Sequence, residues 1–261
     1  MQVYIKNRSI IIMTALILGY ALTLNKAYSA TLSIESGNEY TGTQIEVNVS
    51  LNPSTQESVS ACQFDVLYDT TVYEIIGAVA GDSSLAAQKQ VQYNTVTSGQ
   101  IRVIIAGLNQ NIIPSGSVAK LNVKVCSSAP AGTYELSLNR VILSNPIGTS
   151  VPATPVNGIM TIQRSSYHSA DQNHDWKFSL TEILRVIQLY NSGSYSCSCG
   201  TEDGYDLTGE NRDCVPHNSD YYGTSNWRIQ LYELLRLIQI YNYGSYHSAT
   251  GTEDGFALGL S

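Results

Sequence analysis

Charged side chains are scarce in this sequence, since Asp, Glu, Lys and Arg together make up 13% of its 261 residues. Basic residues are the rarer kind, 14 against 21 acidic residues, and the formal net charge is −7 at pH 7. Because a nucleic-acid partner requires a basic surface that neutralises phosphates, this balance argues against such a partner and favours small cations. The many Gly and Tyr residues, together with Ser, Thr and Asn, indicate a β-rich extracellular protein.

The residue types and motifs that carry catalysis are also few. Histidine occurs four times, always outside residues 31–163, at positions 168, 174, 217 and 247. The chain contains no Gly-x-Ser-x-Gly and no His-Glu-x-x-His motif, and no pair of acids stands out for glycoside hydrolysis. The sequence therefore predicts a binding protein rather than an enzyme.

Long apolar runs are confined to one place near the N-terminus. Lys6 and Arg8 precede an uncharged stretch from Ile10 to Leu24, and small residues follow, with candidate cleavage sites after Ser29 and Ala30. This pattern is typical of a signal peptide over residues 1–30. The alternative is an uncleaved anchor helix, but the stretch is shorter than the roughly 20 residues that span a bilayer. We expect a secreted or cell-surface protein, whose formal charge becomes −10 once the three basic residues of the segment are removed.

Cysteine is uncommon too, and its count is odd. Five cysteines follow the predicted signal segment, at positions 62, 126, 197, 199 and 214. An exported chain meets oxidising conditions, so disulfides are expected, with one thiol left over or paired between chains. The spacing does not supply the four ligands of a structural zinc site. The sequence leaves the pairing open.

Residues 31–163 have the pattern of a β-sandwich. Short alternating or β-branched runs are separated by Gly, Pro, Asn and Ser clusters at regular spacing. In the first clear run, 43–50, the side chains of Ile45, Val47 and Val49 share one face. Further runs lie at 63–68, 72–79, 100–106, 118–125, 133–138 and 159–162. No stretch of this region has a helical period, so we expect a mainly β domain.

Residues 165–261 contain an internal repeat. The segment from Asp175 to Gly193 matches the segment from Asn226 to Gly244 at an offset of 51 residues, and Gly-Thr-Glu-Asp-Gly recurs at 200–204 and 251–255. This half is therefore two copies of one unit.

Each unit predicts one helix of about three turns that ends at Gly193 or Gly244. The predicted apolar stripes, which would pack against each other, are Ile183, Leu184, Ile187 and Tyr190 in the first helix and Leu234, Leu235, Ile238 and Tyr241 in the second. Trp176 and Trp227 precede the two helices at the same place. Packing between the repeats is the favoured role for both, with stacking on sugar rings as the alternative.

Oxygen-bearing residues recur ahead of the first helix at the spacing of an EF-hand calcium loop. Side-chain ligands are expected from Asp171, Asn173, Asp175, Ser179 and Glu182, and the backbone carbonyl of Lys177 adds another. Three carboxylates gathered in this way repel each other, and a divalent cation relieves the repulsion. At loop position 6, Trp176 replaces the usual Gly. The alternative is a polar turn with an Asp cap and solvated acids.

The second loop offers fewer candidate ligands. Aligned on the two tryptophans, it provides Asn226, Gln230 and Glu233 at positions 5, 9 and 12. Its upstream acid, Asp220, lies two residues further from Trp227 than Asp171 lies from Trp176. Either an enlarged loop still binds calcium or the loop is a structural copy.

Residues 167–261 resemble a dockerin, a pair of calcium-loop-plus-helix units that lack the entering helix of a full EF-hand. The resemblance rests on the duplicated unit and on the first loop, which departs from the family at Trp176 and at Glu182, where Asp is usual. It implies Ca²⁺ as the cofactor and a small α domain. It also implies that loop positions 10 and 11 face a protein partner, and these are Leu180, Thr181, Leu231 and Tyr232.

Residues 31–163 resemble a cohesin, the jelly-roll sandwich that binds dockerins and is related to carbohydrate-binding modules. The motifs are Cys62-Gln-Phe-Asp-Val-Leu-Tyr68, Gly99-Gln-Ile-Arg-Val, Ala129-Pro-Ala-Gly-Thr-Tyr134 and Val156-Asn-Gly-Ile-Met-Thr-Ile162. The best-known cohesins contact the dockerin through an Asn-x-Asp, and the matching positions here are Ala61 and Gln63.

Together the two resemblances imply a scaffold or adaptor of the cellulosome type. Such a protein would assemble cohesin- or dockerin-bearing partners outside the cell in a calcium-dependent manner, in the service of polysaccharide breakdown. The alternative is direct carbohydrate binding by the sandwich. That function needs an exposed row of aromatic rings, for which the candidates are Tyr40, Tyr68, Tyr73, Tyr93 and Tyr134.

Overall fold

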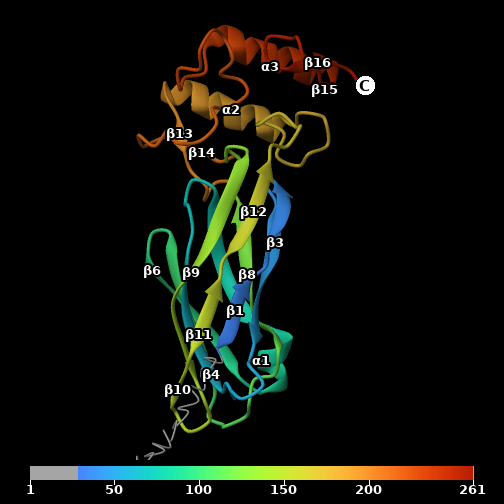
Figure 1. Cartoon of the computed structure of the whole chain (residues 1–261). Helices are drawn as coiled ribbons and strands as arrows, with labels where there is room; N and C mark the ends of the chain where they lie inside the picture. Colours follow the sequence, from blue (N-terminus) through green and yellow to red (C-terminus); the bar gives the residue numbers. More distant parts are fainter. Residues whose placement is uncertain (1–28, 261) are drawn as a thin grey trace, which may run out of the picture.

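A β-sandwich with a small helical domain on one end makes up the computed structural model, which describes residues 29–260 (Figure 1). The predicted signal segment 1–30 therefore falls almost wholly outside the described residues. The first sheet has the order β11 (Ala153–Val156), β1 (Ala30–Ile34), β3 (Gln44–Asn52), β8 (Gly116–Val125), β5 (Tyr73–Ala80). The second has the order β2 (Gly37–Tyr40), β12 (Gly158–Gln163), β9 (Gly132–Ser144), β4 (Ala61–Leu67), β7 (Gln100–Ala106), β6 (Gln90–Thr97), with β10 (Ser150–Val151) paired to β9.

The alternating sequence pattern produces the core of the sandwich. In β3 the side chains of Val47, Val49 and Leu51 are buried, while those between them are more exposed. Phe64 and Leu136, from the other sheet, are fully buried in the same cluster. Because successive side chains of a strand point to opposite faces, each sheet contributes one apolar face to the core. The prediction of a mainly β sandwich is confirmed.

The seven predicted runs correspond to β3, β4, β5, β7, β8, β9 and β12, and the run 100–106 coincides with β7. The strands β1, β2, β6, β10 and β11 were not among them. Strand β6 lies at a sheet edge and is exposed along nearly its whole length, and its apolar alternation is limited to Val91 and Tyr93. The expectation that the region contains no helix was wrong, because α1 (Asp82–Ala86) lies within it. Its five residues are too few to show a helical period.

The C-terminal domain has one helix and one small hairpin in each repeat. Helices α2 (Leu180–Ser192) and α3 (Leu231–Tyr243) end at Gly193 and Gly244, which adopt the left-handed conformation with φ of 74° and 93°. That conformation strongly favours glycine, which explains the stop signal in both repeats. The hairpins are β13 (Ser196–Cys197) with β14 (Tyr205–Asp206), and β15 (Tyr246–Ser248) with β16 (Phe256–Leu258).

The buried faces of the two helices differ from the predicted stripes. The residues in the core are Ile183, Val186 and Leu189 in α2 and Leu234, Leu237 and Ile240 in α3. The prediction was wrong for Leu184 and Leu235, whose side chains are 49% and 54% exposed. The core side of each helix follows positions i, i+3 and i+6, because aromatic rings of the hairpins share this core with the helices. The other members of the predicted stripes are partly buried against this core, and they are Ile187, Tyr190, Ile238 and Tyr241.

Disulfides and hydrogen bonds fasten the C-terminal domain to the sandwich. Cys126, directly after β8, is bonded to Cys199, and Cys197 is bonded to Cys214. The Lys124 ammonium donates to the carbonyl oxygens of Cys199 and Thr201, at 2.9 and 2.8 Å. The remaining cysteine, Cys62, is free and buried in the sandwich. Among the described residues, no helix is long and apolar enough to cross a membrane.

Candidate functional site

The first candidate loop, 171–182, has the backbone of a sharp turn that leads into a capped helix. At position 6, Trp176 has a φ of 63°, the left-handed conformation for which Gly is the usual residue. The substitution therefore leaves the sharp turn in place. Ser179 caps α2, because its hydroxyl accepts from the Glu182 N–H while a Glu182 oxygen accepts from the Ser179 N–H.

Asp171, at position 1, is buried and held by three groups. Its Oδ2 atom accepts from the Trp176 N–H at 3.0 Å and from the Tyr246 hydroxyl at 2.6 Å. Its Oδ1 atom accepts from the Asp175 N–H at 3.2 Å. Burial raises the pKa of the Asp171 carboxyl above its ordinary value, and the hydrogen bond from Tyr246 offsets only part of that rise. The buried charge is thus stabilised by directed N–H and O–H dipoles.

The middle of the loop is more open to solvent than its first residue. The Asn173 oxygen accepts from the Asp175 N–H at 3.1 Å, and the Asp175 carboxylate accepts from the Lys177 N–H at 2.9 Å. These are short-range bonds from backbone N–H groups to side chains two residues away. Glu182, at position 12, is buried, and its Oε1 atom accepts from the Gln172 N–H at 2.8 Å.

The donor chemistry and the backbone of this loop suit Ca²⁺. Hard oxygen atoms are present at every expected position, and the left-handed turn at position 6 is formed. In this conformation both Glu182 oxygens accept from backbone N–H groups. Between residues 29 and 260, no group of three or more His, Cys, Asp and Glu side chains is arranged to hold a metal ion. A carboxylate has about four acceptor sites, so Glu182 keeps accepting capacity beside these bonds.

The second candidate loop copies the frame of the first but not its middle. Asp220 is buried, and its Oδ2 atom accepts from the Trp227 N–H at 2.8 Å and from the Tyr195 hydroxyl at 2.7 Å. Glu233 accepts from the Tyr222 and Gln230 N–H groups. The five residues between Asp220 and Asn226 bring no carboxylate, and Asn226 donates to Asp220 through its backbone N–H. The structure thus places two acids here where the first loop has three.

The two tryptophans have the packing role that the sequence favoured. Both are partly buried against the core of the C-terminal domain. The Trp176 ring lies 5.3 Å from the Tyr246 ring, and the Trp227 ring lies 5.2 Å from the Tyr195 ring. Each tryptophan therefore contacts the tyrosine that follows the helix of the other repeat.

The four predicted partner residues, Leu180, Thr181, Leu231 and Tyr232, are all exposed on the first turns of α2 and α3. Leu184 and Leu235 extend these apolar surfaces by one turn, and sequence reasoning missed them by assigning them to the core. The signal that could have found them is the i, i+4 spacing from Leu180 and Leu231. We call the six residues the helix surface.

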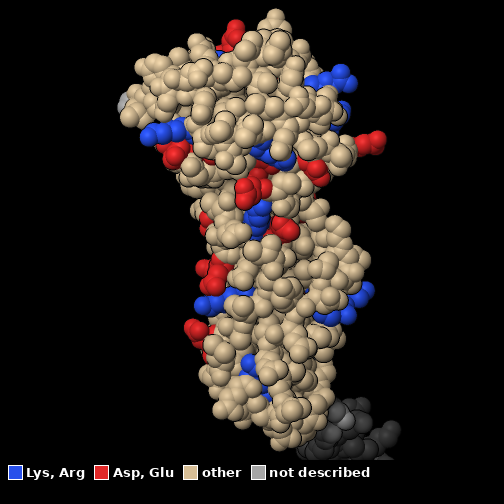
Figure 2. Space-filling model, turned by 180° about the vertical axis from the view of Figure 1, so that it is seen from behind, with Lys and Arg blue, Asp and Glu red and all other residues tan. Residues whose placement is uncertain are grey.

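A second surface lies on the outer side of the β6, β7, β4 and β9 strands. Residue pairing places Gln92, Ile104, Gln63 and Ile142 in one row across them. Ile104 and Ile142 are exposed, and we call this row the sheet surface. Ala61, the other position that matches the Asn-x-Asp of cohesins, pairs with Ser144 next to it. Figure 2 shows the opposite side from Figure 1, on which charged side chains are scattered and most of the surface is uncharged.

The predicted row of aromatic rings for carbohydrate binding does not form. Tyr73 is buried, with its ring edge-on to that of Tyr134. Of the five candidates, only Tyr40 and Tyr93 are exposed, and they lie on β2 and β6 at opposite edges of the sheet. The two rings therefore cannot stack on one sugar chain as a continuous platform.

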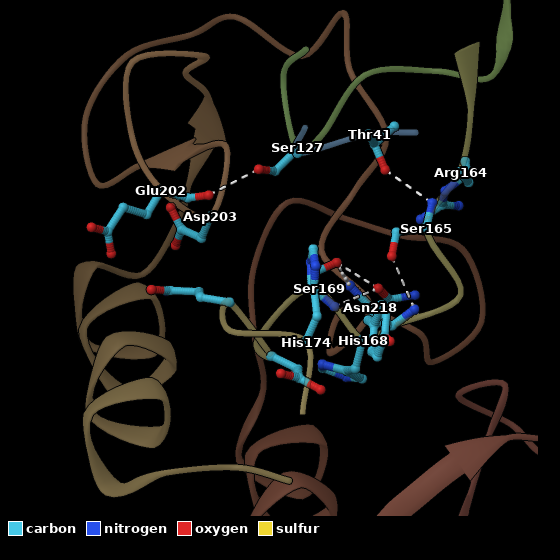
Figure 3. Close-up of a pocket in the computed structure, with 14 residues that line it drawn as sticks. Thr41, Ser127, Arg164, Ser165, His168, Ser169, His174, Glu202, Asp203 and Asn218 are labelled. Atoms are coloured by element: carbon cyan, nitrogen blue, oxygen red, sulfur yellow. Dashed lines mark hydrogen bonds between the residues drawn. The ribbon is translucent and has the colours of Figure 1, made fainter. Parts of the chain in front are cut away.

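The junction between the domains contains a polar pocket beside the first loop (Figure 3). The Ser127 hydroxyl donates to the Glu202 carbonyl at 2.9 Å, and the Ser165 N–H donates to the Thr41 hydroxyl at 3.0 Å. His174, at loop position 4, lines the pocket and stacks on Tyr167 with ring centres 4.5 Å apart. The first loop is thus the one that faces the sandwich.

Comparison with known proteins identifies the sandwich. The family model described as "Cohesin domain" matches residues 30–162. Similar solved structures include the sixth cohesin of scaffoldin B from Acetivibrio cellulolyticus, solved with a Cel5 dockerin mutant, at 25% identity and a TM-score of 0.47 over 52% of this chain and 99% of that one. They also include a non-cellulosomal cohesin from Archaeoglobus fulgidus, at 22% identity and a TM-score of 0.45 over 56% of this chain and 99% of that one. None of the curated proteins compared with the chain matches it. Because the family model covers more than half of the 261 residues, the chain belongs to the cohesin domain family.

Proposed function

We propose that this protein is an extracellular assembly module whose sandwich holds a dockerin-bearing partner. The observation that carries the proposal is the family match over residues 30–162, because cohesins are non-catalytic interaction modules of cellulosome-type scaffolds. A role in polysaccharide breakdown follows from the same family and is part of the proposal.

The sheet surface is the proposed contact for that partner. Gln63 lies between its two exposed isoleucines, Ile104 and Ile142, and Gln92 lies beyond Ile104, so apolar and amide side chains alternate along the row. Protein interfaces commonly have this composition.

A pull-down of dockerin-bearing proteins tests this surface with the double variant Ile104→Asp/Ile142→Asp. Ile76→Asp, at an exposed position of β5 on the other sheet, is the matched control. Capture should be lost with the double variant and kept with the control. Equal capture by both variants would exclude the sheet surface.

The C-terminal domain is proposed to be dockerin-like and to bind one Ca²⁺ in its first loop. The ligands would be the side chains of Asp171, Asn173, Asp175, Ser179 and Glu182 and the carbonyl oxygen of Lys177. The ion supplies positive charge that offsets the gathered carboxylates and orders the loop. The second loop, with Asp220, Asn226, Gln230 and Glu233, is proposed to be a structural copy, because its middle carries no acid.

Isothermal titration of the full mature chain with CaCl₂ tests this site. We expect one ion per chain, which Asp175→Ala should prevent from binding tightly. The matched control Asn226→Ala changes the same position of the second loop and should leave binding intact. No heat of binding, or two ions per chain, would contradict the proposal.

The helix surface is the proposed contact of the C-terminal domain with a second partner, a cohesin-type sandwich on another protein. Its apolar side chains, Leu180, Leu184, Leu231 and Leu235, are exposed on both helices at matching positions. With such a contact the chain would act as an adaptor that carries one partner at each end. Replacing Leu184 and Leu235 by Asp should abolish capture of cohesin-bearing proteins without changing capture of dockerin-bearing ones.

A further inference from the structure

Each repeat of the C-terminal domain sends one tyrosine into the loop of the other repeat. The Tyr246 hydroxyl, which follows α3, donates to Asp171 Oδ2 at 2.6 Å. The Tyr195 hydroxyl, which follows α2, donates to Asp220 Oδ2 at 2.7 Å. Both tyrosines are almost completely buried, and both bonds join groups more than 20 residues apart.

A backbone N–H group donates to each of these two tyrosine hydroxyls. The Tyr246 hydroxyl accepts from the His168 N–H at 3.0 Å, and the Tyr195 hydroxyl accepts from the His217 N–H at 3.1 Å. The Tyr246 N–H itself donates to the Trp176 carbonyl, within the first loop. Tyr246 is thus fixed at both its backbone and its hydroxyl, and it presents its proton to one particular oxygen of Asp171.

The two oxygens of Asp171 differ in how fully they are occupied. Oδ2 receives the bonds from Tyr246 and Trp176, at 2.6 and 3.0 Å. Oδ1 receives one longer bond of 3.2 Å, from Asp175. The carboxylate is therefore anchored through Oδ2, and Oδ1 retains accepting capacity for a cation.

We infer that Tyr246 is a positioning residue for the calcium ligand Asp171, so that the second repeat supports the metal site of the first instead of binding its own ion. This inference rests on the calcium site proposed above for the first loop. It accounts for a second repeat that keeps its helix, hairpin and tyrosine while its loop lacks the middle acid. Partners that orient a metal ligand in this way typically contribute 10- to 100-fold to metal affinity.

Tyr246→Phe tests the inference, with Tyr195→Phe as the matched control. Each substitution removes one buried hydroxyl that bonds an Asp, so both should lower the melting temperature of the calcium-free chain by a similar amount. In isothermal titration with CaCl₂, Tyr246→Phe should bind about tenfold more weakly. Tyr195→Phe should stay within about twofold of the unsubstituted chain, since its loop is not the site.

Three results are decisive. Unchanged affinity in Tyr246→Phe, or an equal loss in both variants, would overturn the inference. A lack of Ca²⁺ binding by the unsubstituted chain would instead overturn the calcium site itself, and the two failures are therefore distinguishable.

Hydrogen exchange on the unsubstituted chain provides a check that requires no variant to fold. Ca²⁺ should slow exchange of the His168 amide, which donates to Tyr246, more than that of the His217 amide, which donates to Tyr195. Equal slowing of both amides would contradict the inference.

Discussion

Removal of the disulfide between Cys126 and Cys199 should separate the unfolding of the two domains. The bond closes a loop of 73 residues, for which the chain-entropy relation gives about 4 kcal/mol of stabilisation at 25 °C. The bond between Cys197 and Cys214 closes only 17 residues, for which the same relation gives about 3 kcal/mol. The larger effect should therefore come from the bond that joins the domains.

The two disulfides should also differ in which parts of the protein they hold together. Without Cys126–Cys199, the junction keeps only hydrogen bonds such as those from Lys124 and Ser128 to carbonyls of the C-terminal domain. Each such bond contributes on the order of 1 kcal/mol, and those to partly exposed groups contribute less. We expect these bonds alone not to keep the two separately folded cores in one cooperative unit.

Differential scanning calorimetry measures this directly. In Cys126→Ser/Cys199→Ser, we expect the helical domain to melt in a separate transition, at least 8 °C or so below the parent, given about 2–4 °C per kcal/mol for chains of this size. Cys197→Ser/Cys214→Ser should lower the melting of the C-terminal domain and leave the sandwich transition in place. One unchanged transition in the first double variant would refute the reasoning.

Three further outcomes are expected. Leu237→Ala should destabilise the C-terminal domain by about 2–5 kcal/mol in urea unfolding, because Leu237 is buried. Leu235→Ala should change its stability by less than about 0.5 kcal/mol, because Leu235 is exposed. A larger loss from Leu235→Ala than from Leu237→Ala would show that Leu235 lies in the core, as the sequence predicted. Asp65 is buried and bonded to Arg102 at 2.6 Å, and this bond lowers the pKa of the Asp65 carboxyl. The pair should therefore stabilise the sandwich at neutral pH, and this contribution should disappear as the pH falls from the unfolded-state pKa of about 4 through the lower folded-state pKa. An Arg102→Ala variant with the same acid unfolding profile as the parent would contradict this. Mass spectrometry of the protein recovered outside the cell should find Ala30 retained, because Ala30 is fully buried in β1. A mature chain that begins at Thr31 would show that this strand end is dispensable.

Most of the sandwich was predictable because its signals are local. Alternation in 43–50 and 100–106 fixes which side chains point inward, whatever the partner strand is. Strand β6 could not be found in this way, since it is an exposed edge strand whose pairing with β7 supplies the stabilisation. The family motifs around Cys62 and Tyr134 indicated the cohesin correctly.

The candidate loop was predictable in its residues but not in its surroundings. The spacing from Asp171 to Glu182 and the cap at Ser179 are properties of a short segment, and they were readable directly. The packing role of Trp176 was predicted, but its left-handed backbone conformation was not, because it depends on tertiary contacts such as the one between its ring and that of Tyr246. The buried faces of α2 and α3 depended in the same way on rings from the hairpins.

The sequence by itself determined the strands with clear alternation, the duplication at an offset of 51 residues, the helix ends at Gly193 and Gly244, and the oxygen atoms offered by the first loop. The tertiary structure alone decided that Cys126 pairs with Cys199, that Cys62 stays free, and that Tyr246 bonds Asp171 across the repeats. The physical reason is the sequence separation over which each kind of interaction acts. Periodicity, capping and turn preference act between neighbours along the chain, whereas a disulfide or a buried hydrogen bond depends on where two distant segments come to lie once the whole chain has folded.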